Sequence, residues 1–121
     1  MKVEAARADT PANHDQGLAQ YCTRHNGFEV GRSNGSYEGA CATLNERAFL
    51  EGYRKGQALY EARSRLSDVE AEISQIDEQR DQKGLSYEIR DELFEKKTRL
   101  EVERVRTRER IERLERETQS L

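Results

Sequence analysis

The chain has 121 residues, of which 37% are charged and only 34% are hydrophobic, and its formal net charge is −3. A typical soluble domain is about 25% charged and about 45–50% apolar, so the length allows one small domain while the apolar content is too low for a single compact globule. No part of the chain has the basic excess that binds nucleic acids or anionic membranes, and no apolar run of about 18 residues could span a bilayer.

The first 42 residues differ in composition from the rest of the chain. They contain five of the eight glycines, the only proline, both cysteines and both histidines, and they show no sustained helical period. We interpret residues 1–14 as a flexible tail that lacks the apolar segment of an intact signal peptide. We interpret residues 15–42 as a compact, turn-rich Cys/Gly-rich knob with one or two short helices.

Glycines recur at every fourth position of this knob: Gly27, Gly31, Gly35 and Gly39. This spacing would give a helix one smooth face, but each glycine inside a helix costs about 1 kcal/mol relative to alanine. We therefore favour a series of turns, with Phe28 and Tyr37 packed between them.

A first long helix is predicted over residues 43–83. Thr43 and Glu46 have the spacing of a capping box, in which the side chain of each accepts from the backbone amide of the other. We expect Gly52 and Gly56, inside this helix, to let the knob backbone approach it closely. Farther along, apolar residues alternate at steps of three and four, the heptad pattern of a coiled coil. These seam residues are Leu59, Ala62, Leu66, Val69, Ile73 and Ile76.

Residues 84–86 are predicted to form a turn before a second long helix over residues 87–121. Gly84 can adopt the left-handed conformation that ends a helix, and Ser86 can cap the next one. The second helix carries a weaker seam, which consists of Leu93, Leu100, Ile111 and Leu114 with polar residues between them. Outside the seam we expect ion pairs four residues apart. They are Glu92–Lys96, Glu95–Arg99, Glu109–Arg113 and Glu112–Arg116.

Folding the chain back at Gly84 brings the two seams into register. Ile76 then lies opposite Leu93 and Val69 lies opposite Leu100, as an antiparallel pair joined by one tight turn requires. We therefore predict an all-α protein, in which the small N-terminal knob is followed by a long antiparallel coiled-coil hairpin. The alternative is one continuous helix that pairs with another chain.

Cys22 and Cys41 flank the glycine-rich segment of the knob. Two cysteines in a turn-rich segment with little core are typical of a disulfide in an oxidising compartment. Two free, buried cysteines in a cytosolic protein fit the spacing equally well. A zinc site built from both cysteines with His25 and His14 is a weaker interpretation, because the sequence lacks a second closely spaced ligand pair. We expect a disulfide staple, no metal and no cofactor.

Catalytic motifs are missing from the sequence. No nucleophile motif surrounds either histidine, and the carboxylates follow solvated helix faces beside basic residues. We therefore expect that the protein is not an enzyme and has no nucleic-acid partner.

The stretch Gly17–Tyr60 contains an ordered series of glycine, tyrosine and cysteine positions. It reads GL-x-x-YC, then NGF-x-x-GR, then GSYEGAC, and finally GY-x-x-G-x-x-x-Y. This series resembles the C-terminal half of the bacterial domain-of-unknown-function family 2799, which is found in proteobacterial envelope lipoproteins. The positions that carry the resemblance are Cys22, Gly31, Gly35, Tyr37, Cys41, Gly52, Tyr53 and Gly56. The resemblance implies an exported, periplasm-facing protein with oxidised cysteines, and it implies no activity.

These observations predict a non-enzymatic structural or protein-interaction module of the bacterial cell envelope. We expect it in the periplasm or as an outer-membrane lipoprotein, held to the membrane only through a lipid anchor outside this chain; the cytoplasm is the alternative location. The hairpin would bind a protein partner or self-associate. The alternative function is a ligand- or metal-binding module centred on Cys22, His25 and Cys41.

Overall fold

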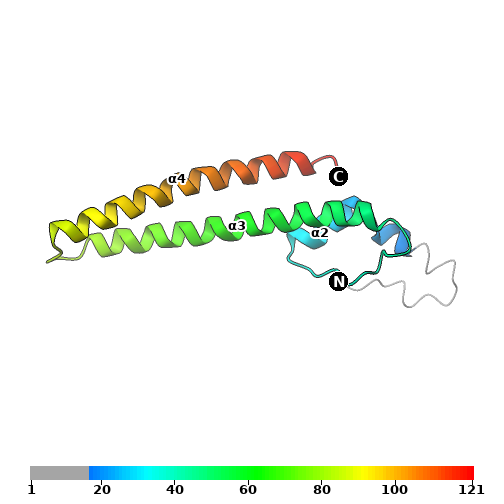
Figure 1. Ribbon diagram of the computed structural model, residues 1–121, viewed down its shortest axis with the longest axis horizontal. Helices are drawn as coiled ribbons and strands as arrows, with labels where there is room; N and C mark the ends of the chain where they lie inside the picture. Colours follow the sequence, from blue (N-terminus) through cyan, green and yellow to red (C-terminus); the bar gives the residue numbers. More distant parts are fainter. Residues whose placement is uncertain (1–16) are drawn as a thin grey trace. The chain divides into compact units, whose positions relative to one another are not determined.

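The structure is a computed structural model that describes residues 17–121. It contains the helices α2 (Arg24–Arg32), α3 (Glu46–Arg80) and α4 (Tyr87–Thr118), with a further helical segment at residues 17–21 (Figure 1). None of residues 17–121 lies in a β-strand. The predicted all-α class is therefore confirmed, while the predicted tail, residues 1–14, lies outside the described part of the chain.

The chain divides into two compact units. One contains the residues up to Glu61 together with Leu114–Leu121, and the other is Ala62–Arg113. Helices α3 and α4 each contribute residues to both units. The two units are described separately below.

The first unit contains the knob. Thr23 caps α2, because its hydroxyl accepts from the backbone amide of Asn26 at 3.0 Å. A single apolar cluster joins the segment before α2, α2 itself, the following loop and the start of α3. Its buried members are Leu18, Tyr21, Cys22, Val30, Cys41 and Phe49. The buried apolar residues of this cluster thus form one small core.

Helix α3 begins at Glu46 and not at Thr43, so the predicted capping box is wrong. Residues 41–45 form turns, in which the amide of Leu44 donates to the carbonyl of Cys41 and the amide of Glu46 donates to the carbonyl of Leu44. The Glu46 carboxylate accepts from the hydroxyl of Tyr37. The Glu46 carboxylate, which the capping box required, therefore forms a tertiary contact with Tyr37 instead.

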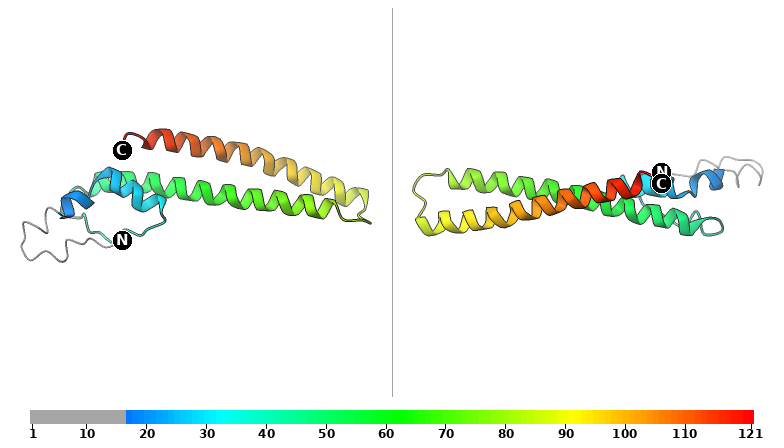
Figure 2. Two further views of the ribbon diagram at one scale, coloured as in Figure 1. Left: turned by 180° about the vertical axis from the view of Figure 1, so that it is seen from behind. Right: turned by 90° about the horizontal axis from the view of Figure 1, so that it is seen from above.

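In the second unit, α3 and α4 run antiparallel and are joined by a short turn, as the views of Figures 1 and 2 agree. Gly84 has φ +84°, the left-handed conformation that favours glycine. The Ser86 hydroxyl accepts from the amide of Ile89 at 3.2 Å and caps α4. The Arg90 guanidinium donates to the carbonyls of Arg80 and Gln82, at the C-terminal end of α3, where a cation is favoured. The predicted hairpin turn is therefore confirmed in place and mechanism.

The predicted seam is the apolar core of this helix pair. Val69, Ile73, Ile76 and Leu100 form one buried cluster, against which Leu93 packs. Leu59 and Ala62 are also buried, and the remaining seam residues Leu66, Ile111 and Leu114 are half-buried. Helix α3 ends at Arg80 and α4 at Thr118, both three residues before the predicted ends. No helix in the described part of the chain is long and apolar enough to cross a membrane.

Three ion pairs join the two helices of this unit, and one, between Arg104 and Glu101, lies along α4. Arg65 bonds to Glu103, Lys97 to Asp77, and Arg108 to Glu70. The four ion pairs expected within the second helix do not form in the structure over residues 17–121, which corrects that prediction. All eight residues of these pairs are exposed, and an ion pair on a solvated helix face contributes too little to hold two long side chains together.

Candidate functional site

The Cys22–Cys41 disulfide lies at the centre of the knob. Its Cα atoms are 5.6 Å apart, and Cys22 and Cys41 are 2% and 0% exposed. The bond links the residue just before α2 to the turn that leads into α3, over a separation of 19 residues. A loop of this size is stabilised by roughly 3 kcal/mol in the chain-entropy model. The disulfide interpretation of the two cysteines is confirmed.

Aromatic rings surround this disulfide. The Phe49 ring lies 5.1 Å from that of Tyr21, 4.8 Å from that of Tyr37 and 6.2 Å from that of Tyr53, measured between centroids. Such pairs contribute about 0.5–1.5 kcal/mol beyond their buried area. Phe49, on the first turn of α3, is therefore the residue around which the knob packs.

Two tyrosine hydroxyls tie the loop between α2 and α3 to the core. Tyr37 donates to the Glu46 carboxylate at 2.5 Å and accepts from the amide of Cys41 at 3.1 Å. Tyr53 donates to the carbonyl of Gly35 at 3.0 Å. Burial raises the pKa of the Tyr37 hydroxyl above its ordinary value, and the bond to the Glu46 carboxylate raises it further. Both tyrosines predicted from the family motif thus act as loop anchors.

Four glycines let α2 cross α3 with their backbones in contact. A Cβ atom added at Gly52 or Gly56 would overlap the carbonyl oxygens of Arg24 or Phe28 on α2. A Cβ added at Gly27 or Gly31 would overlap the carbonyl oxygens of Phe49 or Tyr53 on α3. The close approach predicted for Gly52 and Gly56 is confirmed.

The turns predicted at Gly27 and Gly31 are wrong, because both residues lie inside α2. The energetic cost of glycine in a helix is offset here by backbone packing that no other residue allows. Gly35 and Gly39 do lie outside helices: the amide of Gly35 donates to the carbonyl of Val30, and Gly39 has φ +85°.

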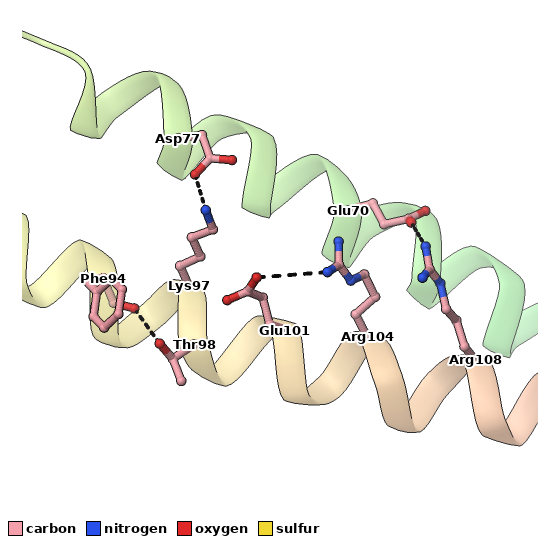
Figure 3. Close-up of polar contacts among 8 residues, drawn as sticks. All are labelled: Glu70, Asp77, Phe94, Lys97, Thr98, Glu101, Arg104 and Arg108. Carbon is pink, nitrogen blue, oxygen red and sulfur yellow. Dashed lines mark hydrogen bonds and ion pairs between the residues drawn. The ribbon is translucent and has the colours of Figure 1, made fainter.

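The seam of the helix pair includes polar residues from α4. Lys97 donates to Asp77 at 2.6 Å and Arg108 donates to Glu70 at 2.8 Å, both across the pair (Figure 3). Arg104 lies 3.9 Å from Glu101, and its buried Nε atom has no hydrogen-bond partner. Thr107 is buried at 9% exposure. Of the polar residues predicted in this seam, Lys97 is thus paired with a charge on α3, whereas Arg104 approaches Glu101 on its own helix.

Helix α4 also exposes large apolar side chains away from the seam. Four of them, which we call the α4 stripe, are Tyr87, Phe94, Val102 and Val105. Their exposed fractions range from 46% to 78%, although α4 is otherwise highly polar. Exposed apolar groups that gather on one face of an element mark interaction sites.

Residues proposed for a metal site do not form one among the described residues. Both sulfurs are joined in the disulfide, so neither is available as a thiolate ligand in this state. Over residues 17–121 no group of three or more His, Cys, Asp or Glu side chains could hold a metal ion, and His14 lies outside that range. A shallow depression beside Cys22 is lined by Ala19, Thr23, Leu44 and Asn45. It carries no ionisable side chain.

Sequence reasoning missed two features of these surfaces. One is the bond from Tyr37 to Glu46, which no local pattern signals because the residues come from different segments. The other is the α4 stripe, for which the sequence does contain a signal. Tyr87, Phe94 and Val105 recur at steps of seven and eleven, which return to the same face of a helix.

Comparison with known families supports the resemblance to family 2799, while its restriction to the C-terminal half of that family stays a prediction. Residues 1–58 match the model of a family described as "Protein of unknown function (DUF2799)". The match ends inside α3 and covers nearly all of the stretch that carries the glycine, tyrosine and cysteine series. The description names no activity and no cellular location. No curated protein and no solved structure matches the chain.

Proposed function

We propose that this protein is a non-enzymatic structural or protein-interaction module of the bacterial cell envelope that faces the periplasm. In this proposal the knob corresponds to the C-terminal half of the DUF2799 family, and the α3–α4 hairpin is the surface that contacts other proteins. Membrane attachment, where it occurs, would depend on a lipid anchor outside the described residues.

The observation that carries the proposal is the Cys22–Cys41 disulfide. It is buried in the knob core, packed with Tyr21 and Phe49, and it joins the two segments that precede α2 and α3. Structural disulfides persist in oxidising compartments such as the periplasm and are rare in the cytosol. A small core that depends on such a bond is therefore expected in an exported protein.

The hairpin supports the interaction role. Its seam is filled by apolar residues from both helices, yet α4 still exposes Phe94, Val102 and Val105 to solvent. A helix pair needs only one apolar face for its own stability. A second apolar face is accordingly expected to bind another protein surface.

Photo-crosslinking in a proteobacterium that expresses the full-length gene would test this proposal. A photoreactive residue at Val102, on the exposed face, is expected to form a discrete adduct in the envelope fraction. The same residue at Ser64, an exposed position of α3, serves as the control. Recovery of the protein in the cytosol, or adducts equally abundant from Ser64, would contradict the proposal.

A further inference from the structure

The α4 stripe forms one continuous face. At 100° per residue, its four members fall within an arc of about 80°, and the arc's centre lies about 140° from the seam residues Leu93 and Leu100. Helix α3 occupies the seam side, since Leu93 and Leu100 pack against Val69, Ile73 and Ile76. Most of the stripe is therefore directed away from α3. The Phe94 ring is 53% exposed, but its centroid lies 5.2 Å from the Cζ atom of Arg80, at the C-terminal end of α3.

Two members of the stripe are symmetric along the helix. Phe94 and Val102 lie four residues on either side of Thr98, whereas the positions equivalent to Val105 and Tyr87 are the charged residues Asp91 and Glu109. A second helix that runs antiparallel and is centred on Thr98 would place Phe94 of each copy against Val102 of the other. Such an arrangement is a two-fold contact in which the same patch is used by both copies.

Charges beside the stripe are arranged for the same two-fold contact. Glu88, Glu95, Arg99 and Arg106 lie on one flank, about 60–100° from the stripe's centre at 100° per residue. All four are exposed, and none forms an ion pair within residues 17–121. The acidic pair precedes Thr98 and the basic pair follows it.

An antiparallel second copy brings these flanks together. Glu95 of each copy then lies opposite Arg99 of the other, and Glu88 lies opposite Arg106, which gives four ion pairs of opposite sign. A parallel copy would turn each flank toward the opposite flank of its neighbour, so the four charges would not meet. Opposite charges across a helix interface select the partner and its orientation.

We infer that the α4 stripe binds a second copy of this chain, antiparallel and centred on Thr98. The inference rests on the proposed function, because it names the partner of the hairpin's exposed face. The occupant is a second copy and not an unrelated protein because the Phe94/Val102 pair and the flanking charges are complementary to themselves about one axis.

Sedimentation equilibrium on the full chain tests the apolar part of the contact. The wild type is expected to form a dimer that Phe94→Glu/Val102→Glu weakens by at least about 100-fold, because each substitution is present twice at the interface. Ile89→Glu is the matched control: Ile89 is 46% exposed on α4 but lies on the seam side. A wild-type monomer at high concentration, or a dimer that the stripe variant leaves intact, would overturn the inference.

A charge exchange tests the orientation without disturbing the apolar stripe. Glu95→Arg alone places like charges opposite each other and is expected to weaken the dimer about threefold to tenfold. Adding Arg99→Glu restores opposite charges in both copies, so Glu95→Arg/Arg99→Glu should regain the wild-type dissociation constant. Failure of the double variant to recover would count against the antiparallel register, since both variants keep the helix exposed and polar.

Crosslinking provides a second measure of register. Thr98→Cys is expected to crosslink to its own copy with a short bismaleimide, because residue 98 lies on the two-fold axis. Val105→Cys should not crosslink, since its two copies would be about 20 Å apart along the helix. The native cysteines do not interfere, because they are joined in the disulfide. Equal crosslinking from both positions would indicate a parallel dimer and overturn the inference.

These outcomes are separable from failure of the proposed function. If the chain is a monomer while Val102 crosslinks to a different envelope protein in cells, the interaction role stands and self-association is wrong. If the purified chain forms the antiparallel dimer but is recovered from the cytosol, self-association stands and the envelope role is wrong.

Discussion

Gly27, Gly31, Gly52 and Gly56 determine how closely α2 approaches α3. Each faces a carbonyl oxygen of the opposite helix, at a distance that a Cβ atom cannot occupy. The four residues form two pairs with the same spacing, one pair on each helix, so the crossing is reciprocal. The glycine series of the sequence is thus explained by backbone packing in α2 and α3, and only Gly39 among the knob glycines is required by a positive φ.

Gly52→Ala tests this crossing. We expect the variant to lower the free energy of unfolding by about 2 kcal/mol or more, because the added methyl group overlaps the backbone of Arg24 and forces the helices apart. Urea unfolding followed by near-ultraviolet circular dichroism of the tyrosines would measure it. Ser64→Ala, at an exposed position of α3, should be neutral or slightly stabilising. A neutral Gly52→Ala would show that the helices do not cross at this distance.

Tyr37→Phe tests the anchor of the loop between α2 and α3. Removing the hydroxyl breaks its bonds to Glu46 and to the amide of Cys41, which is expected to cost about 1–2 kcal/mol at neutral pH. Tyr60→Phe is the control, since Tyr60 is partly exposed and forms no such bond among the described residues. Equal stability of the Tyr37→Phe variant and the wild type at pH 7 would contradict this account.

The cost of Tyr37→Phe should also depend on pH. The native state raises the pKa of Tyr37, so it holds the phenolic proton more tightly than the unfolded chain does. The stability that Tyr37 contributes is therefore complete below about pH 10, the ordinary tyrosine value, and falls as the pH rises above it. The free energy of unfolding would be measured for both proteins between pH 8 and about pH 11. The difference between the wild type and the Tyr37→Phe variant should decrease as the pH rises.

At the scale of elements, the hairpin could be predicted from sequence. Of the knob, only the disulfide and the close approach at Gly52 and Gly56 could be predicted. Seam positions and the Gly84 turn are local patterns, because helical periodicity and a left-handed glycine depend on neighbours in the chain. The start of α3 and the helical state of Gly27 depend instead on contacts between distant segments. The Tyr37–Glu46 bond displaces the predicted cap, and the α2–α3 crossing overrides the low helix propensity of glycine.

Gly84→Ala distinguishes the hairpin from one continuous helix. In the hairpin, alanine at φ +84° is strained, and the variant should unfold with about 1–2 kcal/mol less stability. In a continuous helix, the same substitution would raise stability by about 1 kcal/mol, because alanine is the better helix former. Thermal unfolding of the Gly84→Ala variant would show whether its stability rises or falls. Lys83→Ala, a substitution at the exposed neighbouring position, serves as the control. An increase in stability would contradict the hairpin.

At the scale of the whole molecule, the high charge content is explained by the long helices. Most charged residues lie on α3 and α4, where a narrow apolar seam suffices and cross-helix pairs such as Lys97–Asp77 satisfy part of the charge. The scarce apolar residues of the knob are instead supported by a covalent bond between Cys22 and Cys41. The proposed envelope location follows from that bond, and so does the expectation that reduction destabilises the knob.

The redox state of Cys22 and Cys41 in living cells tests this account most directly. Cells that express the full-length gene would be quenched with acid, and the protein alkylated with and without prior reduction and weighed by mass spectrometry. We predict that neither cysteine is alkylated until a reductant is added, and that a single peptide pair joins Cys22 to Cys41. Two cysteines alkylated without reduction would contradict both the oxidised knob and the periplasmic location.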